Sequence, residues 1–109
     1  MPGKSRWFFD DTAGVGLGET ISIVETLRIN AELIQWSWHA GLQPVAGDLI
    51  EIKKGNLVIV TLDPADLGLT DIVCDNVWQF RRGDVVSMTY TNTDDQNVEA
   101  ELIFREAAP

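Results

Sequence analysis

The feature that most constrains this chain is an alternation of apolar and polar residues with a period of two. In residues 84–91, apolar side chains such as Val86 and Met88 alternate with smaller or polar ones, and residues 98–104 repeat the pattern. Successive side chains of a β-strand point to opposite faces, so each segment predicts a strand with one buried face. A polar cluster, residues 92–97, separates the two segments and predicts a turn. We therefore expect these two strands to form a hairpin.

Further strands are expected along the rest of the chain. Residues 48–53 alternate in the same way and are followed by a turn at Gly55. Residues 57–62 are all apolar or Thr, which is typical of a strand covered on both faces. Shorter strands are expected in residues 20–24, 70–74 and 77–80, and either one helical turn or an irregular loop in residues 65–69.

The segment 27–40 changes its alternation midway. Its apolar residues fall on odd positions up to Leu33 and on even positions from Ile34 onward. One strand cannot bury both sets on one face, so a strand here requires a bulge or bend near residues 31–34. A helix over residues 26–38 is the alternative, because several of the same apolar residues also recur at helical spacing. The alternation in the second half favours the strand.

The fold class expected from these patterns is all-β: an antiparallel β-sandwich or jelly roll of seven or eight short strands. A chain of 109 residues suits one domain. We assign residues 19–106 to that domain. Residues 1–18, with four glycines, are expected to form a flexible N-terminal arm, and residues 107–109 a frayed tail.

The charge balance limits the classes of partner. The chain has 17 Asp and Glu against 8 Lys and Arg, a net charge of −9. Such a surface repels nucleic acid and anionic membranes, so the expected partner is protein. The sequence contains neither a signal-peptide pattern nor an apolar run of the ~20 residues that a membrane span needs. The single cysteine, Cys74, allows no intramolecular disulfide and is expected to be a small buried residue. We expect synthesis and folding in a reducing cytoplasm.

No group of residues indicates catalysis, a metal or a cofactor. The only histidine is His39, and one His with one Cys supplies at most half of a metal site. The acidic turns lack the spacing of a calcium loop, and no serine stands in a nucleophile motif. We therefore expect a protein that is not an enzyme and binds neither metal nor cofactor.

Aromatic residues are the candidate binding residues. Trp7, Phe8 and Phe9 are consecutive, and three consecutive rings cannot all point inward from one strand, so at least one is expected to meet a partner. Exposed rings on a β-sandwich can also stack on sugar rings. The candidates for such stacking are Trp36, Trp38 and Trp78, although two Trp on one face of a small domain more often belong to its core.

The second half of the chain resembles a class of small proteins encoded among the structural genes of tailed bacteriophages. The resemblance rests on a short apolar strand, a Gly-Asp turn, a strand ending in aromatic-x-Asn-x-Asp, and a final amphipathic strand. These stand here as Val77-Trp78-Gln79-Phe80, Gly83-Asp84, residues 86–90 with Asn92 and Asp94, and residues 98–104; Leu62-Asp63-Pro64, Leu69-Thr70-Asp71 and the glycine-rich residues 9–18 also fit.

This resemblance implies a virion accessory protein of the capsid decoration (cement) type. Proteins of that type bind as small oligomers at symmetry points of the expanded shell, reinforce contacts between capsomers and carry no active site. The expected partners are the major capsid protein and further copies of the chain, in a dimer or trimer, and the expected location is the virion, after assembly in the host cytoplasm. A glycan- or receptor-binding β-sandwich module is the alternative function.

Overall fold

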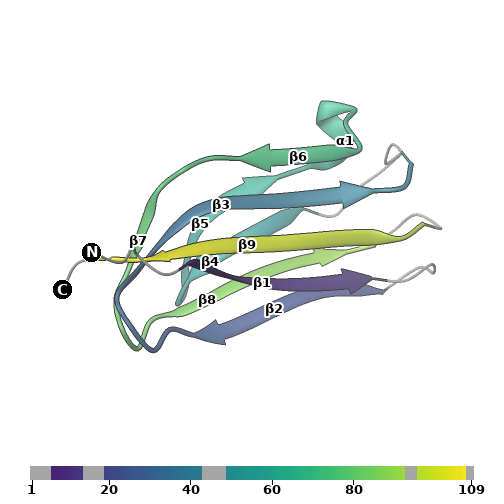
Figure 1. Ribbon diagram of the computed structural model, residues 1–109. Coiled ribbons are helices and arrows are strands. Elements are labelled where there is room, and N and C mark those ends of the chain that lie inside the picture. The colour runs from purple at the N-terminus through teal and green to yellow at the C-terminus, as the bar shows by residue number, and fades with distance from the viewer. Residues whose placement is uncertain (1–5, 14–18, 43–48, 93–95, 108–109) are drawn as a thin grey trace.

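Almost all of the alternating segments form strands in the computed structural model, which describes residues 6–13, 19–42, 49–92 and 96–107. Nine strands and one short helix follow each other in this part of the chain (Figure 1). They are β1 (Arg6–Ala13), β2 (Thr20–Thr26), β3 (Ala31–Ala40), β4 (Ile50–Lys54), β5 (Leu57–Leu62), α1 (Pro64–Leu67), β6 (Asp71–Cys74), β7 (Trp78–Phe80), β8 (Val85–Thr91) and β9 (Val98–Glu106).

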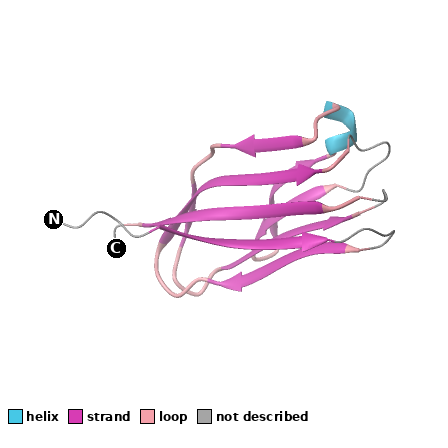
Figure 2. Ribbon diagram, turned by 45° about the vertical axis from the view of Figure 1, so that its right-hand side comes forward, coloured by secondary structure: helices cyan, strands magenta, loops and turns pink. Residues whose placement is uncertain are grey.

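The strands form two antiparallel sheets that face each other as a β-sandwich (Figures 1 and 2). Sheet A has the order β1-β9-β3-β6, with β7 also paired to β3, and sheet B has the order β2-β8-β4-β5. The inward residues of both sheets make one core. Its largest fully buried side chains include Trp36, Trp38, Tyr90, Phe80 and Phe104. The all-β sandwich expected from the sequence is thus confirmed.

Strand β3 confirms the predicted change of alternation. Leu33 and Trp36 both point into the core, and the pairing of β3 with β9 shifts register between Leu33 and Gln35. A bulge places one extra residue in β3, so both halves of the strand bury their apolar residues on the same face. The strand interpretation of residues 26–39 is therefore correct for β3, and the helix alternative is wrong there.

The hairpin expected between residues 84–91 and 98–104 is wrong. Both segments are strands, but β8 pairs with β2 and β4 in sheet B, whereas β9 pairs with β1 and β3 in sheet A. Alternation with a period of two reports which face of a strand is buried, and both strands do bury one face. It does not report which neighbour the strand pairs with, so the chain can cross from one sheet to the other between them.

Buried amide side chains lie at the two described ends of this crossing, at Asn92 and Gln96. Asn92 is fully buried, and its Nδ2 donates to the carbonyl oxygen of Gln96 at 2.5 Å. The backbone N–H of Asn92 donates to the carbonyl oxygen of Glu19 at 2.7 Å, at the start of β2. The Gln96 side chain is also buried, and its Oε1 accepts from the backbone N–H of Leu42 at 2.5 Å. These bonds connect the crossing to the ends of β2 and β3.

The expected N-terminal arm is wrong for residues 6–13, because they form β1 and pair with β9 along their whole length. This strand adds one to the number expected from the sequence. Residues 1–5 and 14–18 of the expected arm lie outside the described residues. In the expected tail, the N–H of Ala107 donates to the carbonyl oxygen of Asn30 at 2.9 Å, so Ala107 is not frayed. Residues 108–109 also lie outside the described part.

Strand β5 corrects a further expectation, since it is not covered on both faces. It lies at the edge of sheet B, and its first two residues, Leu57 and Val58, are 65% and 42% exposed. The helical turn expected after it is present as α1. Asp63 caps this turn by accepting from the N–H of Ala65 at 2.9 Å, and Gly68 ends it with a φ of 63°. Within the described residues, the structure has no helix long and apolar enough to cross a membrane.

We predict that Asn92→Ala lowers the free energy of unfolding by about 1–3 kcal/mol, because it leaves buried partner groups without a hydrogen bond. Urea denaturation followed by tryptophan fluorescence measures this change. Asn76→Ala is the matched control, since Asn76 is exposed, and it is expected to change stability by no more than about 0.5 kcal/mol. Equal effects of the two substitutions would contradict a structural role for Asn92.

Candidate functional site

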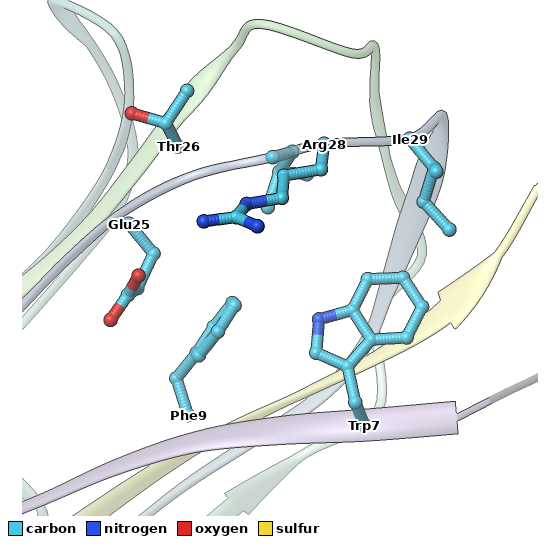
Figure 3. Close-up of a pocket in the computed structure, with 7 residues that line it drawn as sticks. Trp7, Phe9, Glu25, Thr26, Arg28 and Ile29 are labelled. Carbon is cyan, nitrogen blue, oxygen red and sulfur yellow. The ribbon is translucent and has the colours of Figure 1, made fainter.

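A groove of about 410 Å³ lies between β1 and the connection from β2 to β3 (Figure 3). Strand β1 supplies Trp7 and Phe9, β2 supplies Glu25 and Thr26, and residues 27–29 of the connection complete the lining. The alternation of β1 explains the contribution of that strand. Its odd-numbered residues face the space between the sheets, so Trp7 and Phe9 are half-buried while Phe8 points the other way.

The aromatic floor of the groove is fixed to the core through Phe104. The ring of Trp7 stacks on Phe104 with centroids 5.9 Å apart, and the ring of Phe9 meets it edge-on at 5.7 Å. Phe104 also contacts Phe80 edge-on at 5.5 Å. Because the floor packs on a fully buried ring, the groove is preformed in this structure.

The other wall of the groove is held by the turn at residues 81–84. The backbone N–H of Leu27 donates to the carbonyl oxygen of Asp84 at 2.8 Å, and the N–H of Gly83 donates back to Leu27 at the same distance. The side-chain oxygen of Asn30 accepts from the N–H of Arg82 at 3.0 Å. These bonds fix the short connection that carries Arg28 and Ile29, so the position of the wall does not depend on a partner.

The groove combines an apolar floor with two charged side chains. Figure 3 shows the guanidinium of Arg28 projecting from the connection toward the rings of Trp7 and Phe9, with the carboxylate of Glu25 on the same side. An aromatic face favours a flat apolar group or a sugar ring, and a guanidinium favours a carboxylate or a carbonyl oxygen. The lining contains no His, Cys or Ser. This arrangement is therefore suited to binding.

Phe8 lies on the outer face of sheet A and is 60% exposed. A second hollow, of about 350 Å³, adjoins the groove. Phe8 and Val24, which is 61% exposed on β2, lie at this hollow, together with the polar side chains of Asp10, Asp11 and Ser22. Ile29, at the wall of the groove, is also exposed. We call the edge of the sandwich that carries Trp7, Phe8, Phe9, Val24 and Ile29 the β1–β2 margin. The sequence drew attention to the first three of these residues. Val24 and Ile29 were missed because an isolated apolar residue carries no signal until the fold shows its neighbours.

Acidic residues lie beside Phe8 on the same outer face. Asp10 of β1 stands directly opposite Glu101 of β9, and Glu99 follows two residues away on β9. These three residues line one shallow hollow with His39. Like charges directly opposite each other on neighbouring strands destabilise a sheet, so a basic partner would relieve this pair.

The structure places the three Trp residues expected to stack on ligands in different environments. Trp36 and Trp38 are each only 1% exposed, and Trp38 meets Tyr90 of the opposite sheet edge-on at 5.4 Å. Both are core residues, so the ligand-stacking prediction is wrong for them. Trp78 is half-buried against the edge of the core, and its role in binding stays a prediction.

His39 and Cys74 lie apart from the groove. His39 is exposed, and its Nδ1 is hydrogen-bonded to Asp71 of the neighbouring strand β6. This hydrogen bond raises the pKa of His39 above its ordinary value of 6.5, and the negative charges of Asp71 and Glu99 add to the effect. Cys74 is half-buried; burial, with the nearby charge of Asp75, raises the pKa of its thiol, which is the opposite of activation. Within the described residues, no three metal-binding side chains converge on one point.

Neither a protein-family model nor a curated protein sequence matches this chain. Solved structures do match, and they agree with the two antiparallel sheets in defining its class as a β-sandwich. One is a chain in the acidic stable capsid structure of Helicobacter pylori bacteriophage KHP30. It has 10% identity and a TM-score of 0.66, over 98% of this chain and 92% of that one.

Two further solved structures share the fold. A family 35 carbohydrate-binding module from an environmental isolate has 12% identity and a TM-score of 0.53, over 94% of this chain and 98% of that one. The Drosophila NLP core, a structure described for pentamer formation and histone binding, has 11% identity and a TM-score of 0.53, over 89% of this chain and 96% of that one. At these identities the similarities establish the fold.

We predict that Asp71→Asn lowers the pKa of His39 toward 6.5, because it removes the main cause of the raised value. Proton NMR reports this directly, since His39 is the only histidine of the chain. A group whose pKa is raised by folding stabilises the fold at pH values below the unfolded pKa, and this contribution is lost as the pH rises through the folded pKa. The contribution of the His39–Asp71 pair to the free energy of unfolding should therefore decline as the pH rises above 6.5.

Glu99→Gln is the control for this titration. The charge of Glu99 is the smallest of the causes that raise the pKa of His39, so the substitution should lower that pKa by less than Asp71→Asn does. If the pKa of His39 were the same in the wild type and in Asp71→Asn, the pairing of His39 with Asp71 in solution would be ruled out.

Proposed function

We propose that this chain is a virion structural protein that decorates and stabilises a phage capsid, and that its β1–β2 margin contacts the capsid subunits. The observation that carries the proposal is the similarity of fold, over nearly the whole chain, to a chain of the KHP30 capsid structure. The strand and turn pattern that resembles small phage structural proteins supports the same function. In this function the chain acts through protein–protein contacts in the virion, without catalysis, and its main partner is the major capsid protein.

The surface chemistry of the margin suits such a contact. Phe8 and Val24 expose apolar side chains on neighbouring strands, and burying an aromatic residue of this size stabilises an interface by roughly 1.5–3 kcal/mol. A shell repeats the contact many times, so a modest affinity for each copy is sufficient where copies are linked to each other.

The charge beside the margin specifies the partner further. The opposed carboxylates of Asp10 and Glu101 lie next to Phe8 on the outer face of sheet A. A capsid surface with basic residues around an apolar pocket would match this face, and it would guide association at low salt. The net charge of −9 then keeps unbound copies soluble until they dock.

We predict that Phe8→Ala weakens binding to capsids by about 10- to 150-fold, since the ring contributes about 1.5–3 kcal/mol when buried. The measurement uses purified expanded capsids assembled without this protein, to which the wild type and the variant are added back and pelleted. Leu67→Ala is the matched control, because Leu67 is an exposed apolar residue on α1, away from the margin. Equal binding of the wild type and Phe8→Ala would show that the margin is not the contact.

Asp10→Asn separates the role of charge in binding from its role in stability. The substitution removes the like-charge pair with Glu101, so it should raise the free energy of unfolding by a few tenths of a kcal/mol. It should at the same time weaken capsid binding and reduce the dependence of that binding on salt. If Asp10→Asn bound capsids more tightly than the wild type, the proposal that the partner surface is basic would be contradicted.

The second candidate is a glycan-binding module, and the groove itself favours it. A sugar ring could stack on Trp7 while Arg28 and Glu25 bind its polar groups. The fold shared with a family 35 carbohydrate-binding module is compatible with this function. Trp78 remains a second aromatic residue that could contribute to it.

A glycan array tests this candidate with the wild type, Arg28→Ala and Trp78→Ala. Arg28 is exposed, so its removal should leave the fold intact. If the function is glycan binding in the groove, the wild type should bind at least one class of glycan, and Arg28→Ala should lose about tenfold or more in affinity because a charged hydrogen bond is removed. If Trp78→Ala lost glycan binding and Arg28→Ala kept it, the glycan site would lie at β7 and not in the groove. A wild type that binds no glycan on the array removes the candidate.

A further inference from the structure

The four edges of the two sheets are not equally protected against pairing with another strand. Strand β1 carries the charges of Asp10 and Asp11. The carboxylate of Asp11 also accepts a hydrogen bond from the backbone N–H of Ser22 at 2.8 Å, so this N–H of β2 is not available to another strand. Strand β6 has only four residues and begins with Asp71. Charges, short length and covered main-chain groups are the usual means by which edge strands avoid pairing.

Strand β5 has neither the charges nor the short length, and its one irregularity is a bulge in its pairing with β4. Its six residues, Leu-Val-Ile-Val-Thr-Leu, contain no charge, proline or glycine. One side of β5 pairs with β4, and no strand in the described part of the chain pairs with the other side. Leu57 and Val58, at the start of this strand, are 65% and 42% exposed. An apolar edge strand of this kind is a template for the addition of another strand.

The directions of the side chains make β5 complementary to a second copy of itself. Val60 and Leu62 lie opposite the buried Ile52 and Ile50, so both point inward. Val58 and Thr61 lie opposite Lys53 and Glu51, in the alternate positions that point outward. Leu57 is the partner of Lys54, whose ammonium lies over the buried ring of Phe80, so Leu57 also points inward.

The bulge in the pairing with β4 completes this pattern. The register shifts there, so Ile59 has no partner on β4, and its side chain packs against the core beside Val60. The sequence of directions along β5 is therefore in, out, in, in, out, in, and it reads the same from both ends. In an antiparallel two-fold pair, Leu57 meets Leu62 of the second copy, Val58 meets Thr61, and Ile59 meets Val60, each on a matching face.

Charge at the two ends of β5 favours the same arrangement. Lys53 lies beside its first residues, and Asp63 and Asp66 follow its last. Antiparallel pairing brings the basic end of one copy beside the acidic end of the other, whereas parallel pairing would bring like charges together. This complementarity counts because two chains of net charge −9 otherwise repel each other.

We propose that two copies of this chain pair antiparallel through the free edges of β5, joining their four-stranded sheets into one continuous sheet. Strand β2, with its part of the β1–β2 margin, lies at the opposite edge of sheet B. The pairing therefore leaves both margins and both grooves open. It does not rest on the capsid function and would hold for a glycan-binding module as well.

Sedimentation equilibrium of the wild type tests the proposal over a range of about 1 μM to 1 mM, since pairing along a single strand buries little surface and gives a weak complex. The expected result is a rise in mass from that of one chain, 12.1 kDa, to twice that value. Hydrogen exchange gives a second readout that needs no substitution, because the amides of β5 should exchange more slowly as the concentration rises. A wild type that stays monomeric over the whole range overturns the proposal.

Paired substitutions then test the register. V58K/T61K puts Lys opposite Lys at both pairs of outward positions, and it should raise the dissociation constant at least about tenfold. V58K/T61E puts Lys opposite Glu at the same positions, and it should pair as well as the wild type or better. Val24→Lys on β2, the other edge of sheet B, is the matched control and should also pair normally. All three positions point outward on the surface, and far-ultraviolet circular dichroism verifies the fold of each variant.

Two results would contradict the proposed pairing. If V58K/T61K and V58K/T61E lost pairing equally, the antiparallel register would be wrong. If Val24→Lys abolished the dimer while V58K/T61K kept it, the interface would lie at β2 instead of β5. Neither result bears on the proposed capsid function, which is tested separately by the binding of Phe8→Ala to capsids.

Discussion

The contacts of Phe104 connect the aromatic floor of the groove to the core. Its ring lies on β9, the strand between β1 and β3, and it touches Trp7, Phe9 and Phe80. These rings fix β1 to the sandwich and form the floor of the groove. A partner that binds the β1–β2 margin therefore meets a surface that is already ordered, and little of the binding free energy is lost to ordering the chain.

Much of the fold follows from the alternation of residues, because each strand must bury one face. The change of alternation in residues 27–40 even located the bulge of β3 near Leu33. Strand pairing did not follow, since the pattern of β8 and β9 is the same whether the chain turns back within one sheet or crosses to the other. The exposure of β5 was also missed, because a fully apolar strand has the same composition at the centre of a sheet as at an unprotected edge.

The candidate site was predicted only in part. Three consecutive aromatic residues indicated that one ring must face outward, and Phe8 does. The flexible arm was inferred from the glycines of residues 1–18, which drew attention away from the alternation of Trp7, Phe9 and Ala13 within β1. The difference matters for function: removing residues 1–18 would remove a strand that is paired along its whole length with β9, so such a truncation cannot report on binding alone. Arg28 and the acidic pair at Asp10 became visible only when the fold brought separate segments together.

The position of β9 within sheet A has a consequence for biosynthesis. This strand, residues 98–106, pairs with both β1 and β3, which are made much earlier. Sheet A therefore cannot close until residue 106 has emerged from the ribosome. Products of translation interrupted before β9 would lack the middle of one sheet and would be open to proteolysis, so only chains that contain β9 would persist as folded protein.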